Sequence, residues 1–141
     1  MTRVCIINAV GLTPELLKYA PRISAVGDAQ PMQSPIPAVT CTSQATLLTG
    51  KSPREHGIVG NGWYFRDTQE IRFWQQANSL VEGEKFYEGI ETAKMFWWFN
   101  QGANVDWSVT PKPHYGADGS KAFDILSTPG PLGKELQNWS K

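Results

Sequence analysis

The apolar positions at the start of the chain follow the pattern of an α/β unit. Residues 3–10 contain four consecutive apolar side chains, from Val4 to Ile7, which is typical of a strand covered on both faces. A hydroxyl, a proline and an acid at positions 13–15 then favour a helix that runs to about Ala20. A strand, a turn and a helix in so short a stretch predict the first unit of an α/β fold.

The rest of the chain extends this pattern. Helix-forming residues over 42–49, followed by Gly50, predict a helix and its C-terminal end. The aromatic run over 94–99 predicts a strand buried on both faces. Further helices are expected over 21–27, 69–81, 84–94 and 131–140, a further strand over 105–109, and turns or loops over 30–39, 55–67 and 111–130. The predicted fold class is therefore α/β, with part of a mostly parallel sheet flanked by helices.

The composition excludes several classes of function. The 141 residues include 13 basic and 13 acidic side chains, so nothing in the net charge favours binding to nucleic acid or to an anionic membrane surface. No apolar run approaches the ~20 residues of a membrane-spanning helix, and the start lacks the features of a signal peptide. The two cysteines, Cys5 and Cys41, do not form a disulfide framework. We expect a single cytoplasmic domain over residues 1–141.

The segment that carries candidate chemistry surrounds Thr40. An extended Pro-Ala-Val leads into this threonine, which stands directly before the predicted helix. The backbone N–H groups of Cys41 and Thr42 and the positive end of the helix dipole would then face an anion such as phosphate or sulfate. The Thr40 hydroxyl is a nucleophile if a metal ion lowers its pKa. The alternative is that Thr40 only caps the helix.

This segment resembles the nucleophile region of the alkaline phosphatase superfamily, in its type I phosphodiesterase/nucleotide pyrophosphatase branch. The matching positions occur in the order of that branch: Pro37, Thr40, Thr49-Gly50, Pro53, His56-Gly57-Ile58 and Asn61. The spacing from Thr40 to Asn61 is that between the nucleophile of the branch and its oxyanion-binding Asn. The resemblance therefore implies catalytic roles for Thr40 and Asn61.

Sulfatases of the same superfamily provide a check on the register. Counting back from Leu48-Thr49-Gly50 places the nucleophile at Thr40 and not at Cys41. The Pro and Arg of the sulfatase pattern are replaced by Thr42 and Gln44. A sulfatase is disfavoured on this ground. A phosphomonoesterase or a sulfatase of the same superfamily is kept as an alternative.

The resemblance also implies two divalent metal ions, zinc or alternatively manganese. Members carry a metal-binding Asp at the end of the first strand, but here Val10 precedes Gly11, and Asn8 is the substitute ligand beside Thr40. The chain has only two histidines, too few for the histidine-rich metal centre of the family. We therefore expect an incomplete alkaline-phosphatase-like core, the N-terminal part of such a catalytic domain.

The expected substrate is a small phosphate ester or a nucleotide. Besides Asn61 and the Cys41 backbone, the aromatic pair Trp63 and Tyr64 follows the site and is predicted to contact a base or an aryl group. The alternative is that this pair packs in the core. Overall we predict a hydrolase of phosphodiester or pyrophosphate bonds, with a non-catalytic relative or anion-binding module as the alternative. An incomplete sheet would expose apolar surface, which predicts self-association.

Overall fold

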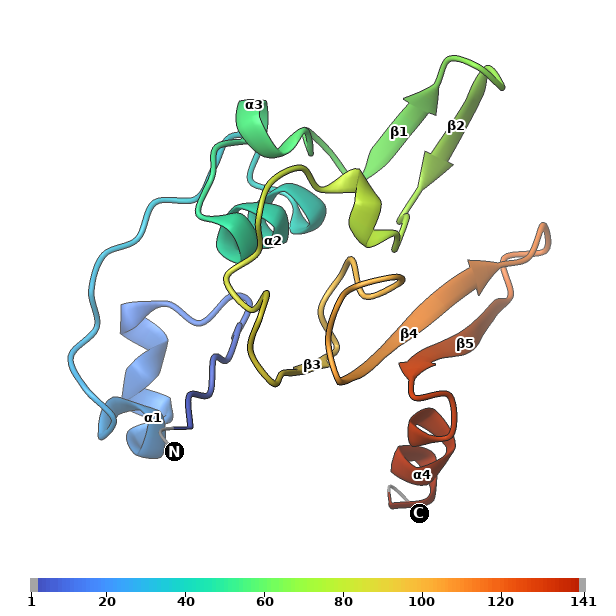
Figure 1. Cartoon of the computed structure of the whole chain (residues 1–141). Helices are drawn as coiled ribbons and strands as arrows, with labels where there is room; N and C mark the ends of the chain where they lie inside the picture. Colours follow the sequence, from blue (N-terminus) through green and yellow to red (C-terminus); the bar gives the residue numbers. More distant parts are fainter. Residues whose placement is uncertain (1–2, 140–141) are drawn as a thin grey trace. The chain divides into compact units, whose positions relative to one another are not determined.

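The computed structural model describes residues 3–139 of the chain (Figure 1). The described residues divide after Gln33 into two compact units, and each is considered by itself. The first holds a 3₁₀ helix, η1 (Pro14–Tyr19), and a short helix, α1 (Pro21–Ser24). Each begins with a proline at its first position, where the missing N–H costs no hydrogen bond. The helical segments predicted from residue 13 and over 21–27 are therefore present in shorter form.

The strand predicted over residues 3–10 is wrong. These residues pair with no strand, and the side chains of Val4, Ile7 and Val10 are 81%, 80% and 85% exposed. An apolar run becomes a buried strand only when neighbouring strands accept its hydrogen bonds and cover its faces. No described residue of the first unit is buried, so this unit has no core of its own.

The second unit contains two small sheets. Strands β1 (Gly62–Phe65) and β2 (Glu70–Phe73) form an antiparallel hairpin. Strands β3 (Ala93–Met95), β4 (Trp107–Tyr115) and β5 (Lys121–Thr128) form the other sheet in that order, with β3 parallel and β5 antiparallel to β4. The prediction of a mixed α/β chain is confirmed, but the mostly parallel sheet is wrong, because most strand pairs are joined by short connections that permit only antiparallel pairing.

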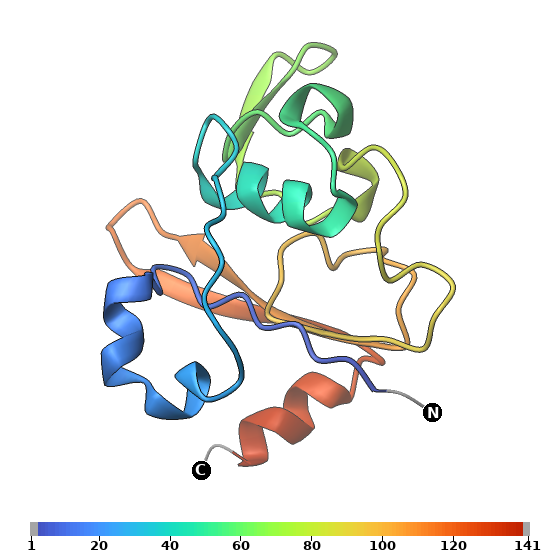
Figure 2. The same cartoon turned by 90° about the vertical axis from the view of Figure 1, so that its left-hand side faces the viewer.

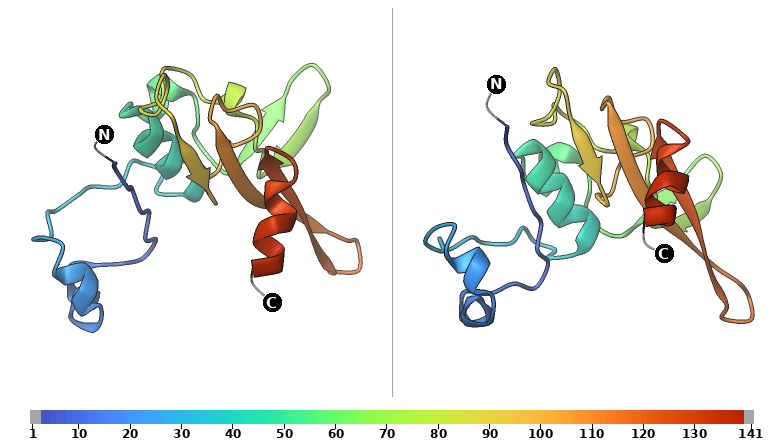
Figure 3. Two further views of the ribbon diagram at one scale, coloured as in Figure 1. Left: turned by 60° about the horizontal axis from the view of Figure 1, so that its bottom comes forward. Right: turned by 90° about the horizontal axis from the view of Figure 1, so that it is seen from below.

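The segment predicted as turns over 111–130 is instead the long β4–β5 hairpin. Its turn contains Gly119 with a φ of +80°, a conformation that favours glycine. Pro111 and Pro113 lie in β4 beyond the last residue paired with β3, where a missing N–H breaks no ladder hydrogen bond. The helix α4 (Leu132–Trp139) packs beside this hairpin (Figure 3). It confirms the helix predicted over 131–140 as far as the described residues reach.

Helix α2 (Thr40–Thr49) confirms the predicted helix and begins two residues earlier. Gly50 ends it with a φ of +67°, and its N–H donates to the Thr46 carbonyl, as expected of a C-terminal glycine. The short helix α3 (Pro53–His56) follows and lies next to α2 (Figures 1 and 2). Its start is closed by Ser52, whose N–H and hydroxyl both donate to the Glu55 carboxylate.

The helices predicted over 69–81 and 84–94 are wrong. That part of the chain holds β2, the 3₁₀ helix η2 (Asn78–Leu80) and turns. Gln69 and Trp74 in the first range and Gly89 in the second have positive φ angles, which no α-helix contains. The strand predicted over 94–99 is reduced to the end of β3, since Phe96 has a φ of +62° and is mostly exposed. The strand over 105–109 begins later, as β4.

The core of the second unit is built on one face of α2. Cys41, Ala45 and Leu48 are spaced along that face and are buried. They pack with four buried side chains from later segments, Ile58, Val81, Tyr87 and Phe99. Partly buried tryptophans surround this cluster, at positions 63, 74, 97 and 98. The core therefore fixes the orientation of α2, and with it the position of Thr40 at its first turn.

No helix within the described residues is long and apolar enough to cross a membrane.

We predict that stability rises with pH because of the buried Lys94. Its ammonium group is enclosed and donates to the Phe99 carbonyl, and burial together with the nearby Lys85 lowers the pKa of Lys94 to about 7. The unfolded chain therefore binds more protons than the folded one above pH ~7. The free energy of unfolding should rise between pH ~7 and ~8.5, by at most about 1.4 kcal/mol per pH unit.

Urea unfolding followed by tryptophan fluorescence at several pH values measures this slope. Lys94→Met should flatten it, whereas Lys134→Met, at an exposed position, should leave it unchanged. Equal slopes in wild type and Lys94→Met would contradict the assignment.

We also predict self-association through the first unit. Its exposed apolar side chains have no cover within the unit: Val4, Ile6, Ile7, Val10, Leu16, Tyr19, Ile23, Val26 and Met32. Light scattering should show oligomers at micromolar concentration, and Ile7→Lys with Val10→Lys should reduce their mass. A monodisperse wild-type monomer would rule this out.

Candidate active site

Thr40 stands at the junction of an extended segment and α2. Val39 has a φ of −118° and a ψ of 160°, so the chain enters the helix from an extended conformation. Thr40 is the first helical residue and not the cap, and its side chain is exposed. The hydroxyl therefore lies at the positive end of the α2 dipole and is accessible to a ligand.

Asn61 is held beside this helix start by one hydrogen bond. The Cys41 backbone N–H donates to Asn61 Oδ1 over 2.9 Å. Because a backbone N–H only donates, the side-chain atom that it meets is the carbonyl oxygen. The amide NH₂ group of Asn61 is therefore left to donate elsewhere. The structure thus brings together Thr40 and Asn61, the two residues that the sequence analysis paired.

The same bond corrects one expectation. The sequence analysis treats the Cys41 N–H as a free donor for substrate, but in the structure it donates to Asn61. The Cys41 side chain is also fully buried, and burial raises the pKa of its thiol to about 11. The thiol is therefore protonated and inaccessible at neutral pH. Of the two neighbouring side chains, Thr40 alone is accessible to a ligand.

The loop that carries Asn61 is attached to α2 through the buried His56. The Ile58 N–H donates to His56 Nδ1 over 3.1 Å, so Nδ1 is the unprotonated ring nitrogen. The other nitrogen, Nε2, then carries the hydrogen and donates to Thr46 Oγ1 over 2.9 Å. Burial lowers the pKa of His56, which favours this neutral form at neutral pH.

A second set of contacts holds the main chain of Asn61. The Trp74 N–H donates to the Asn61 carbonyl over 2.9 Å, and the Trp74 ring packs on Trp98 with the ring centroids 5.4 Å apart. The Trp98 N–H in turn donates to Gln44 Oε1 over 2.8 Å. Because Gln44 lies on α2 one turn after Thr40, these contacts form a closed circuit from the helix to Asn61 and back.

Sequence reasoning missed Gln44 and Trp74. The signal for Gln44 was its spacing, since a residue four positions after Thr40 lies on the same face of a helix. No local signal marks Trp74, because its contact with Asn61 depends on the pairing of β1 with β2.

The two aromatic residues after Asn61 lie in different surroundings. Trp63 is half-buried and meets the Phe99 ring edge-on, with centroids 6.5 Å apart, so its indole is part of the core packing. Tyr64 is 60% exposed and lies opposite Ile71 on the hairpin. Gly62 allows a close approach here, since a Cβ at this position would lie 2.7 Å from the Phe73 ring. Of the two, Tyr64 is the side chain more accessible to a ligand.

The residues present do not fit a two-metal centre. Asn8 offers only a neutral amide oxygen, and both ring nitrogens of His56 are already engaged. His114 lies on β4, where its Nε2 pairs with Asp124 over 2.8 Å. Within residues 3–139, no group of three His, Cys, Asp or Glu side chains is arranged to hold a metal ion. No step below is therefore assigned to a metal.

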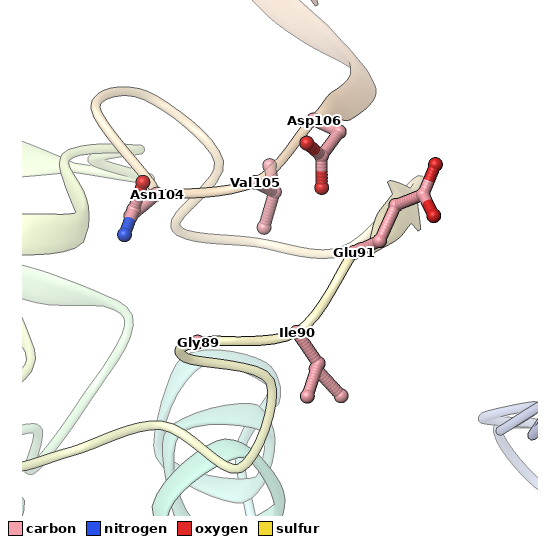
Figure 4. Close-up of a pocket in the computed structure, with 6 residues that line it drawn as sticks. All are labelled: Gly89, Ile90, Glu91, Asn104, Val105 and Asp106. Atoms are coloured by element: carbon pink, nitrogen blue, oxygen red, sulfur yellow. The ribbon is translucent and has the colours of Figure 1, made fainter.

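One hollow of the surface lies at a different place (Figure 4). It is lined by Gly89, Ile90, Glu91, Asn104, Val105 and Asp106, none of which belongs to the site around Thr40. The Asp106 carboxylate already accepts the Thr92 N–H over 2.8 Å, and Figure 4 shows the Glu91 carboxylate directed away from the hollow. Its two acids therefore do not converge on a ligand.

Two substitutions of Asn61 test the hydrogen bond that its side-chain oxygen accepts from the Cys41 N–H. Asn61→Ala removes the acceptor of the Cys41 N–H and should lower the free energy of unfolding by about 1 kcal/mol. Asn61→Asp keeps an oxygen there and adds a negative charge at a helix N-terminus, so its stability should equal or exceed that of wild type. Thermal and urea unfolding at neutral pH measure both. An Asn61→Ala variant as stable as wild type would refute the role of this bond.

Comparison with known proteins identifies the family of the chain. The family model for type I phosphodiesterase/nucleotide pyrophosphatase matches residues 4–139. No curated protein and no solved structure matches the chain significantly. The matched region contains α2, the Asn61 loop and both sheets. On this match, the chain belongs to the type I phosphodiesterase/nucleotide pyrophosphatase family.

Proposed function

We propose that this chain provides the nucleophile and the phosphoryl-binding amide of a metal-dependent hydrolase of phosphodiester or pyrophosphate bonds. Its family is one of phosphodiesterase- and pyrophosphatase-type hydrolases. The observation that carries the proposal is the bond from the Cys41 N–H to Asn61 Oδ1. It holds the Asn61 amide next to the exposed hydroxyl of Thr40, at the positive end of α2.

The chemistry follows from these groups. A phosphoryl group at the start of α2 meets the helix dipole, which favours negative charge. The Asn61 NH₂ donates to a non-bridging oxygen and stabilises the charge that develops there in the transition state. Thr40 Oγ1, its proton released to water, attacks phosphorus in line, and the bond from phosphorus to the leaving oxygen breaks as that oxygen takes up a proton from water. Water then hydrolyses the phosphothreonine.

For this family we propose zinc as the metal ion, with manganese as the alternative. Such an ion would lower the pKa of a hydroxyl that coordinates it. Of the predicted ligands, Thr40 is accessible and Asn8 offers only a neutral amide oxygen, which binds a divalent cation less tightly than a carboxylate. The described residues do not complete this centre.

The proposed substrate is a small phosphate ester or a nucleotide. The exposed Tyr64 ring is available to an aromatic leaving group, whereas Trp63 contributes through the packing of the site. A sulfatase is disfavoured for a structural reason as well. The position of the sulfatase arginine is occupied by Gln44, whose carbonyl is engaged with the Trp98 N–H.

One observation favours a second candidate, a non-catalytic anion-binding module. The described residues contain the helix start and the Asn61 amide but no cluster of metal ligands. Such a module would bind phosphate at Thr40 without breaking a bond. Both candidates predict anion binding, and only the first predicts turnover.

Hydrolysis of a chromogenic phosphodiester with added zinc or manganese separates the two. If Thr40 is the nucleophile, Thr40→Ala should lower the rate by at least about a hundredfold, and Thr40→Ser should keep part of it. Ser43→Ala, on the same helix, is the matched control and should retain the wild-type rate.

Equal rates in wild type and Thr40→Ala would exclude Thr40 as the nucleophile. If neither protein turns over, phosphate titration followed by calorimetry decides for the module. Wild type should then bind phosphate, and Asn61→Asp should bind it at least about tenfold more weakly because its carboxylate repels the anion.

A further inference from the structure

The buried His56 has no role in the reaction proposed above, yet it joins the two parts of the site. Its ring is fully buried and makes two hydrogen bonds, one as a donor and one as an acceptor. Nε2 meets Thr46 on the helix that begins with Thr40, and Nδ1 accepts the N–H of Ile58 on the loop that ends at Asn61. The imidazole is therefore the link between the nucleophile helix and the start of the Asn61 loop.

The loop between His56 and Asn61 has few other attachments. Gly57 is in the left-handed conformation with a φ of +78°, Ile58 is buried in the core, and Val59 is exposed. At its far end, Asn61 is held by the Cys41 N–H and by the Trp74 N–H. At the near end, the Gly57 N–H donates to the Pro53 carbonyl, and the bond from Ile58 to the imidazole is the next polar contact along the loop as it leaves α3.

We propose that His56 is a positioning residue for Asn61, and that it acts only as the neutral Nε2–H tautomer. A proton on Nδ1 would place an N–H against the N–H of Ile58 and replace an attraction by a repulsion. The turn at Gly57 would then open, and Asn61 would lose its register with the Cys41 N–H. The site would thus be assembled at neutral pH and uncoupled in acid. The consequence for turnover rests on the proposed function, whereas the coupling itself does not.

The charged groups near His56 affect its protonation less than burial does. Helix α2 carries no charged side chain. Arg54 and Glu55 directly precede His56 in α3, and the Glu55 carboxylate already accepts a hydrogen bond from the Ser52 hydroxyl. After η2, the Glu82 N–H donates to the backbone carbonyl of His56, and the Glu82 side chain is exposed. Glu55 favours the protonated ring, but burial opposes it and is the larger effect on the pKa of His56.

The sign of the pH dependence follows. The folded protein lowers the pKa of His56. The neutral ring therefore contributes its full stabilisation of the folded state above the ordinary histidine pKa of about 6.5, and this contribution is lost as the pH falls further. The second histidine provides an internal control. His114 is half-exposed on β4 and pairs with Asp124, far along the chain from the Asn61 loop.

The test is an NMR titration of the whole ¹⁵N-labelled chain from pH ~7.5 to ~4.5. Ring ¹⁵N shifts should identify the Nε2–H tautomer of His56 at neutral pH. As His56 titrates, below about pH 6.5, the Cys41 amide and the Asn61 side-chain NH₂ signals should shift with the same midpoint. The protection factor of the Cys41 amide, which corrects its exchange rate for the pH dependence of intrinsic exchange, should fall by at least about fivefold across that midpoint, the loss expected of one hydrogen bond.

Three variants complete the design. His56→Asn keeps an acceptor near the Nδ1 position and cannot be protonated, so the transition at Cys41 and Asn61 should disappear. His56→Gln keeps a donor near Nε2 but lacks that acceptor, so the protection factor of the Cys41 amide should be low at every pH. His114→Asn should leave the transition as in wild type.

Two results would overturn the proposal. One is a Cys41 and Asn61 environment that does not change while the His56 ring titrates, a measurement that needs only the wild-type chain. The other is a transition that persists in His56→Asn or vanishes in His114→Asn. Failure of the proposed function would look different: no variant would show turnover, while the spectra would still report the coupling. If turnover is present, the acidic fall in kcat should be absent in His56→Asn.

Discussion

The site depends on a single hydrogen bond between the first turn of a helix and a side chain from a loop. The first N–H groups of any helix lack partners within the helix. Here one of them, from Cys41, finds its acceptor in Asn61 and not in a capping hydroxyl. The helix start is stabilised by this bond, and the same bond orients the Asn61 amide. Stability and proposed function therefore share one contact.

Around that bond, side-chain amides replace regular secondary structure. In the aromatic segment after β3, the N–H groups of Trp98 and Phe99 donate to the side-chain carbonyls of Gln44 and Gln76. Asn100 and Lys94 bond carbonyls of the same region. Buried polar side chains of this kind specify one loop conformation, because each leaves an unsatisfied group if the loop moves. The aromatic segment is thus fixed by polar contacts as well as by packing.

The sequence predicted the parts of the molecule that depend on local signals. Helix α2 and its glycine end follow from signals within one short stretch, and the pairing of Thr40 with Asn61 is implied by the resemblance to the family. The sheets depend on partners far along the chain, so an apolar run such as 3–10 carries no information on whether a partner strand is present. The aromatic run near 96 misled for a related reason: its side chains pack in a bent loop, and a strand and a bent segment share the same composition.

The prolines of β4 have a consequence for assembly. The Phe96 N–H donates to the Val109 carbonyl, so residues of the same parity as Val109 direct their backbone groups away from β5. Pro111 and Pro113 share that parity. Beyond β3, the outer edge of β4 therefore presents carbonyls without the matching donors at alternate positions, and a further strand cannot add there in regular register. Two prolines therefore close this edge of the sheet to the addition of another strand.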